Sequence, residues 1–89
     1  MARRLLISPQ FEPSRERLGI LPGSTEGLAV ARSMQVLADT DELPFANSEG
    51  LLMPPVLWSW RYPVPRTQLA LMYWFDEETV TFISVRRQR

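Results

Sequence analysis

Residues 68–86 read QLALMYWFDEETVTFISVR, and this stretch decides the fold class. Two runs rich in aromatic and β-branched residues flank three consecutive acids, which predicts two antiparallel strands joined by a tight turn. Alternate side chains of the first run form two stripes, one with Leu69, Leu71, Tyr73 and Phe75 and the other with Ala70, Met72 and Trp74. Both stripes are apolar, so both faces of this strand are expected to be covered. Helices can cover one face, which leaves the other for a tail, a dimer mate or a partner protein.

A third strand is expected just upstream, over residues 56–62, and residues 63–66 separate it from the first run. It carries Trp58, Trp60 and Tyr62 at a period of two, so these aromatic side chains project from one side. They fit an ordinary small core. The alternative is an exposed platform for stacked bases or for a partner's helix.

The N-terminal half predicts one more strand and two helices. Residues 5–7 are apolar and stop before a proline, which predicts a short strand, and residues 12–20 can form a short helix. Ser24 or Thr25 can cap a longer helix through about Ala38, with Val30, Met34 and Leu37 on one face. Residues 39–53 are expected to be an acidic loop. Together these elements predict a single α+β domain over residues 1–89, with two N-terminal helices packed on a small, mostly antiparallel four-stranded sheet in the order strand, helix, helix, strand, strand, strand.

Composition excludes several classes of function. The chain has no Cys and no His, which rules out a disulfide framework, a thiolate zinc site and a Ser-His-Asp hydrolase. Its four glycines fit no phosphate-binding loop, so no cofactor is expected. Because Cys and His are both missing, no metal is expected either. With no membrane span and no signal sequence in view, we expect a cytoplasmic protein that does not enter a membrane.

Charge is balanced overall but not along the chain. The formal net charge is zero, which argues against bulk coating of nucleic acid. Residues 1–10 carry two Arg and no acid, residues 11–50 three Arg and seven acids, and residues 51–89 five Arg and three acids. The terminal arginines, including Arg86 and Arg87, would form one basic surface if the two ends of the chain lie together. Solvated ends that protect edge strands are the plainer interpretation.

From Trp60 to Arg87 the sequence resembles the RelE/ParE superfamily, the toxins of type II toxin–antitoxin systems. The resemblance lies in Trp60-Arg61-Tyr62, in the hydrophobic strand 69–75 with its acidic turn, and in a last strand that ends in Arg86 and Arg87. It implies a bacterial, cytoplasmic toxin that cleaves messenger RNA on the ribosome or inhibits DNA gyrase. It also implies neutralisation by a cognate antitoxin protein, and a homodimer is a further arrangement to test.

The same resemblance gives the candidate site residues as Arg61, Tyr62, Tyr73, Arg86 and Arg87. Arginine can stabilise a phosphorane but is a poor base, so a metal-independent endoribonuclease would need Tyr62, Tyr73 or a carboxylate as proton acceptor. A tyrosine in an apolar strand is more often a core residue with a bonded hydroxyl, which favours the core for Tyr73 and leaves both roles open for Tyr62.

One departure bears on activity. Ala70 stands where the family often has an arginine that holds the scissile phosphate, which leaves enzymatic activity open. Two rivals follow: a non-catalytic protein-binding module on a toxin-like fold, and an unrelated small homodimer.

Overall fold

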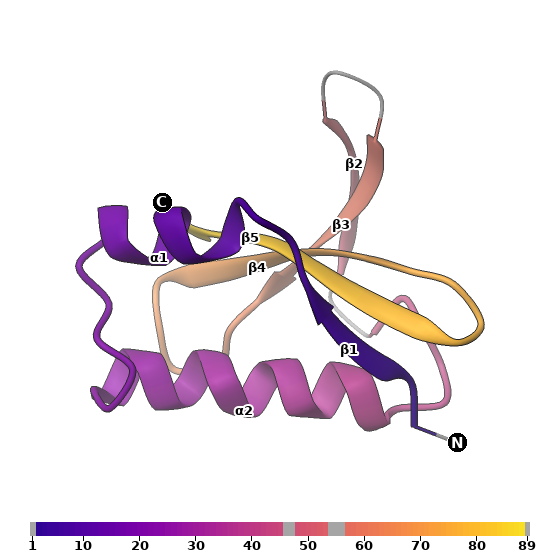
Figure 1. The fold of residues 1–89 in the computed structure, drawn as a ribbon, viewed down its shortest axis with the longest axis horizontal. Coiled ribbons are helices and arrows are strands. Elements are labelled where there is room, and N and C mark those ends of the chain that lie inside the picture. The colour runs from indigo at the N-terminus through magenta and orange to yellow at the C-terminus, as the bar shows by residue number, and fades with distance from the viewer. Residues whose placement is uncertain (1, 46–47, 54–56, 89) are drawn as a thin grey trace.

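The computed structural model describes residues 2–45, 48–53 and 57–88, and for residues 51–53, 57 and 58 it describes the backbone alone. Within these ranges no helix is both long and apolar enough to cross a membrane. The elements follow along the chain in the order β1 (Arg4–Ile7), α1 (Phe11–Arg17), α2 (Thr25–Asp39), β2 (Glu49–Met53), β3 (Leu57–Pro63), β4 (Leu69–Phe75) and β5 (Thr79–Arg87) (Figure 1). The fold is therefore α+β with two helices, as the sequence predicts.

The sheet differs from the expected one in two respects. It has five strands in the order β1-β5-β4-β3-β2, and it is mixed, because β1 runs parallel to β5 while the other pairs are antiparallel. The extra strand, β2, lies inside the stretch that was expected to be an acidic loop. Glu49 and Gly50 disfavour strands by themselves. Pairing with β3 stabilises the strand conformation of these residues, since Glu49 lies opposite Arg61 and forms an ion pair with it.

Helix α2 forms where the apolar stripe predicts it. The Ser24 hydroxyl accepts a hydrogen bond from the Gly27 backbone N–H at 3.1 Å, which caps the first turn. Gly27 is required here, because a Cβ would lie 2.1 Å from the Leu21 carbonyl oxygen. The helix crosses one face of the sheet (Figure 1).

The main core lies between α2 and the sheet. Its buried cluster includes the two predicted stripes, Leu69, Leu71 and Tyr73 from β4 and Val30, Met34 and Leu37 from α2. Trp60 packs partly buried against it and Tyr62 is buried in it, so these two aromatics belong to the core rather than to an exposed platform. The side chain of Trp58 lies outside the described residues. The expected core is thus confirmed for the side chains that the structure describes.

The opposite face of β4 is closed in part within the single chain. Ala70 and Met72 are buried there, whereas Trp74 is 40% exposed. The register of β4 against β5 shifts between Met72 and Tyr73, so a β-bulge interrupts the ladder at this point. The covering expected from a tail, a dimer mate or a partner is needed only around Trp74.

The acidic turn between β4 and β5 is organised by a single carboxylate. Asp76 accepts hydrogen bonds from the backbone N–H groups of Glu78 and Thr79, at 2.8 and 2.7 Å, and from the Thr79 hydroxyl at 3.0 Å. These bonds, with that from Glu78 the largest contribution, lower the pKa of Asp76. Asp76 therefore acts as a turn former rather than as one of a catalytic pair.

Candidate anion-binding cleft

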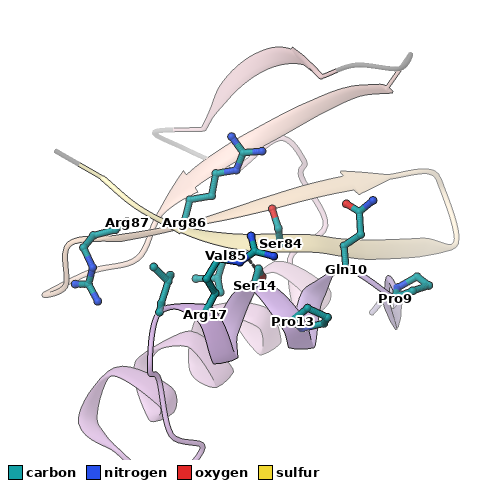
Figure 2. A pocket seen from close by; sticks show the side chains of 10 residues that line it. Pro9, Gln10, Pro13, Ser14, Arg17, Ser84, Val85, Arg86 and Arg87 are labelled. Atoms are coloured by element: carbon teal, nitrogen blue, oxygen red, sulfur yellow. Dashed lines mark hydrogen bonds between the residues drawn. The ribbon is translucent and has the colours of Figure 1, made fainter.

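A cleft of about 680 Å³ opens between α1 and the C-terminal half of β5. Pairing with β1 ends at Phe82, so the edge of β5 beyond that residue is free for α1 to approach. Figure 2 shows Ser84 and Arg86 on one side of β5 and Arg87 on the other, with Ser14 and Arg17 approaching from α1. The cleft therefore wraps around a strand edge and is lined from two elements that are far apart in the sequence.

Two serine hydroxyls hold α1 against this edge. The Ser14 hydroxyl accepts from the Val85 backbone N–H at 3.0 Å and donates to the Phe11 carbonyl at 2.6 Å. The Ser8 hydroxyl donates to the Ile83 carbonyl at 2.8 Å. Phe11, buried in the core, anchors the first turn of the helix. These contacts satisfy backbone groups of the strand edge and at the same time fix one wall of the cleft.

The lining is strongly basic. It includes Arg17, Arg86 and Arg87 and not one carboxylate among the described residues. Arg87 lies 3.6 Å from the Glu26 carboxylate, a loose and partly exposed pair, whereas no ion pair or hydrogen bond in the described part of the chain engages the side chains of Arg17 or Arg86. Guanidinium groups bind phosphate oxygens as planar forks. The arrangement suits a phosphate or a similar anion.

A serine lies beside these arginines with unused hydrogen-bonding capacity. The Ser84 hydroxyl lines the cleft, is buried, and has no hydrogen-bond partner within the described residues. Buried hydroxyls normally have a partner, so the Ser84 hydroxyl is a polar group beside the cleft that the described residues leave unsatisfied.

Arg61 lies outside the cleft on the same face of the sheet as Arg86. The ladders align Arg61 with Met72 and Met72 with Ser84, two residues before Arg86. From the strand spacing, the Arg61 and Arg86 Cα atoms are roughly 12 Å apart. Arg61 is also neutralised by Glu49. Of the expected basic residues, the structure thus brings Arg86 and Arg87 into the cleft and leaves Arg61 at a distance.

Both candidate tyrosines are core residues. The Tyr73 hydroxyl accepts from the Phe45 backbone N–H at 3.1 Å and shares a 2.7 Å hydrogen bond with the Ser48 hydroxyl. Tyr62 packs edge-on against the Phe45 ring, with centroids 5.5 Å apart. Burial raises the pKa of each tyrosine. A raised pKa leaves less of the phenolate, the form that accepts a proton, near neutral pH, and both side chains lie in the core.

The terminal arginines that the structure describes do not form one surface, because β1 is parallel to β5. Arg89 lies outside the described residues. Arg4 pairs with Thr79, at the start of β5, and Arg86 lies seven residues further on, roughly 23 Å along the strand. Figure 1 shows the start of β1 and the end of β5 at opposite ends of the sheet. Arg3 is a structural residue, since it donates to the carbonyls of Asp76 and Thr40 at 2.8 and 3.0 Å.

No pattern in the sequence indicated Arg17, Ser14 or Ser84 as site residues. Arg17 is one of several charges in a short exposed helix, and the contact of Ser14 with Val85 spans 71 residues. Within the described residues, no group of three acidic side chains lies close enough to hold a metal ion.

No protein-family model matches this sequence. No curated protein matches it either. The geometry of the cleft is therefore the basis on which its chemistry is argued.

Proposed function

We propose that this chain is a toxin-like domain of the RelE/ParE type that binds the phosphate groups of a nucleic-acid target in the cleft between α1 and β5. The observation that carries the proposal is the cleft lining, which holds three arginines and no carboxylate among the described residues, and in which only Arg87 has an ion pair, a loose one with Glu26 outside the lining. Nucleic acid presents a regular series of phosphates to such a lining. Both branches that the resemblance implies, ribosome-bound messenger RNA and DNA held by gyrase, contain this group.

Arg86 supports the proposal at the position where the sequence departs from the family. Ala70 pairs directly with Arg86 across the β4–β5 ladder, so Arg86 presents its guanidinium on the same face from the neighbouring strand. The small side chain at position 70 leaves room for it. Arg86 is exposed and has no ion pair within the described residues. It can therefore supply the phosphate contact that the resemblance places at position 70.

Cleavage of RNA requires a proton acceptor in addition to phosphate binding. A proton must leave the attacking 2′-hydroxyl, and the described side chains of the cleft include neither a carboxylate nor a tyrosine to accept it. On the ribonuclease branch the acceptor would come from the ribosome or from the substrate itself. On the gyrase branch no side chain of this chain has to take part in a proton transfer.

The same lack of a proton acceptor favours a second candidate, a non-catalytic binding module on a toxin-like fold. Such a module would bind a nucleic acid or a protein without inhibiting growth. The antitoxin remains part of the first proposal only, and a neighbouring gene whose product restores growth would support it.

The test is induced expression in a bacterial host of the wild type, Arg86→Ala, Arg17→Ala and Arg4→Ala. Arg4 is the matched control, because it is exposed and lies at the other end of β5. Growth, the integrity of ribosome-bound messenger and plasmid supercoiling are followed together. We expect the wild type and Arg4→Ala to inhibit growth and the two cleft variants to inhibit it less. On the ribonuclease branch, each cleft variant should lose roughly a hundredfold in cleavage rate, as when one transition-state charge contact is removed.

The readouts separate the alternatives. Cleaved messenger with normal supercoiling supports the ribonuclease branch, and altered supercoiling with intact messenger supports the gyrase branch. If the wild type leaves growth, messenger and supercoiling unchanged, the toxin proposal gives way to the binding module. If Arg86→Ala and Arg17→Ala inhibit as strongly as the wild type, the cleft is not the site.

A further inference from the structure

A second hollow, of about 500 Å³, lies between α2 and the connection from β3 to β4. Figure 1 shows this connection running down to the side of α2. The hollow shares no lining residue with the cleft at β5. We name it the α2 groove and define it by Leu28, Arg32 and Val36 on the helix and by Tyr62, Pro65 and Arg66 on the opposite wall.

The helical wall of the α2 groove carries large aliphatic side chains that are exposed to solvent. Leu28 is 56% exposed and Val36 is 40% exposed, although both are large aliphatic side chains. With Arg32 they follow one another at intervals of four residues, so they form one stripe about 12 Å long on the surface of α2. The buried stripe of the same helix faces the sheet, so the side chains of this second stripe do not pack in the core. Two large aliphatic side chains that remain exposed along one hollow, on either side of an arginine, favour a binding surface.

The charge of the α2 groove has a single sign. Arg32 lies on the helix and Arg66 on the opposite wall, and the lining holds no carboxylate among the described residues. No ion pair or hydrogen bond within those residues involves either guanidinium. Aliphatic side chains beside two arginines that have no ion pair among the described residues are complementary to a surface that carries both apolar side chains and negative charges.

Arg66 occupies a backbone conformation that ordinarily favours glycine. Its φ is 63°, and it follows Pro65 as the third residue of a turn closed by the Thr67 N–H donating to the Val64 carbonyl at 3.3 Å. In a type II turn glycine normally fills this position, because a Cβ is unfavourable there. The turn is also fixed by the Thr67 hydroxyl, which donates to Val64 at 2.9 Å and accepts from the Leu69 N–H at 3.0 Å. A strained arginine held rigidly at the rim indicates a role for its side chain.

We infer that the α2 groove docks an acidic amphipathic helix of a partner protein. The apolar face of that helix packs on Leu28 and Val36, and carboxylates on its two flanks pair with Arg32 and Arg66. A stripe of about 12 Å matches two turns of a docked helix, whose anchors recur every three or four residues. The site stands independently of the proposed toxin activity, because it is separate from the cleft and is tested by binding alone.

Two other occupants fit the α2 groove less well. A second copy of this chain, paired through α2 about a two-fold axis, would bring Arg32 at the middle of the stripe against its own counterpart. The apolar face of α2 is already buried in the core of its own chain, and α1 carries as many arginines as acids, so neither helix can serve as the docked helix. RNA would require exposed aromatic rings for stacking, and Tyr62, the aromatic residue of the groove, is 7% exposed.

The experiment is a selection of displayed helical peptides of about 20 residues, randomised at their surface positions, on the purified full chain. The enriched peptides are then measured against variants. Leu28→Ala and Arg66→Gly alter the groove, and Leu21→Ala and Arg4→Ala are their matched controls, because Leu21 is 69% exposed and both control residues lie outside the groove. An RNA oligonucleotide and sedimentation of the chain alone test the other occupants.

We expect enriched peptides with an apolar stripe and flanking Asp or Glu. Leu28→Ala and Arg66→Gly should weaken their binding at least about fivefold, the loss typical of a residue that contributes to an interface, and the controls should leave it unchanged. Arg66→Gly should also raise Tm by about 4 °C, because it relieves the left-handed strain. Weaker binding by a more stable variant rules out unfolding as the cause.

Several results would overturn the inference. These are a selection without enrichment, enriched peptides that are basic or uncharged, or enriched peptides that bind Leu28→Ala and Arg66→Gly as tightly as the wild type. Tight RNA binding that is lost in Arg66→Gly would reassign the groove to nucleic acid. Dimerisation of the chain alone that is lost in Leu28→Ala would reassign it to a second copy.

Discussion

Tyr73 shows how one buried hydroxyl connects the sheet to a loop. Its ring lies in the core, fully buried, while its hydroxyl accepts from the Phe45 N–H and bonds the Ser48 hydroxyl. Residues 45 and 48 both lie in the connection that leads to β2, so the tyrosine positions the start of that strand. A residue that the family resemblance suggests for catalysis has a structural role here.

Removing this hydroxyl should destabilise the protein measurably. We expect Tyr73→Phe to lower the free energy of unfolding by about 1–3 kcal/mol, because the Phe45 N–H and the Ser48 hydroxyl lose their partner. Tyr62→Phe is the control, since no hydrogen bond within the described residues involves the Tyr62 hydroxyl. Urea denaturation measures both. Equal losses in the two variants would contradict a special role for the Tyr73 hydroxyl.

The same burial predicts how stability depends on alkaline pH. Burial raises the pKa of Tyr73 and of Tyr62 above that of an unfolded tyrosine, near 10. A raised folded-state pKa means that the folded protein holds the two tyrosine protons more tightly than the unfolded chain does. The stabilisation that this gives the folded state is complete below about pH 10 and is lost as pH rises through the folded-state pKa. We expect the urea midpoint to fall steeply above about pH 10, and to fall less in Tyr73→Phe. A midpoint that is constant to pH 11 would contradict it.

At the scale of elements, β4 and α2 were readable from the sequence because their periodicity records the side that faces the core. Leu71 and Leu37 lie on such stripes, and both are fully buried. Strand β2 was not readable, because Glu49 and Gly50 resemble a loop until β3 lies beside them. The wall of the cleft was hidden for a similar reason, since Ser14 and Val85 meet only through tertiary structure.

The packing of β4 against α2 should provide a large share of stability. Leu71→Ala should lower the free energy of unfolding by about 2–5 kcal/mol, because it leaves a cavity at a site with no exposure to solvent. Leu21→Ala, at an exposed site, should change it by less than about 0.5 kcal/mol. Chemical denaturation compares the two. A loss of under about 0.5 kcal/mol for Leu71→Ala would contradict the position of the core.

The attachment of α1 to β5 can be tested separately from global stability. Ser14→Ala leaves the buried Val85 N–H without an acceptor, which should cost about 1–3 kcal/mol and accelerate hydrogen exchange at Val85. Ser24→Ala removes the α2 cap at a similar cost of about 1 kcal/mol, and serves as the control. After correction for global stability, exchange at Val85 should be faster in Ser14→Ala alone. Equal exchange in both variants would show that another group holds α1.

At the scale of the whole molecule, balanced net charge coexists with local surfaces of one sign. The cleft and the α2 groove are both basic, while acids are concentrated in residues 39–49 and 76–78. The sequence indicated that Arg86 and Arg87 matter, but the grouping of arginines depends on the parallel pairing of β1 with β5, which separates the two ends of the chain. Under the proposed function, nucleic acid therefore contacts one local surface rather than the whole protein.

This locality predicts a shallow dependence of RNA binding on salt. If single-stranded RNA places phosphates against Arg17, Arg86 and Arg87, the slope of log K against log salt should be near −2, because each phosphate contact contributes about −0.7. Arg86→Ala should make the slope shallower by about 0.7 and weaken binding of all sequences alike, whereas Arg4→Ala should leave it unchanged. Fluorescence anisotropy with a labelled oligonucleotide between 50 and 200 mM salt measures both, a range chosen for its strong effect on phosphate contacts. A slope that stays near −2 in Arg86→Ala would remove the cleft from RNA binding, and a much steeper slope in the wild type would show that arginines outside the cleft take part.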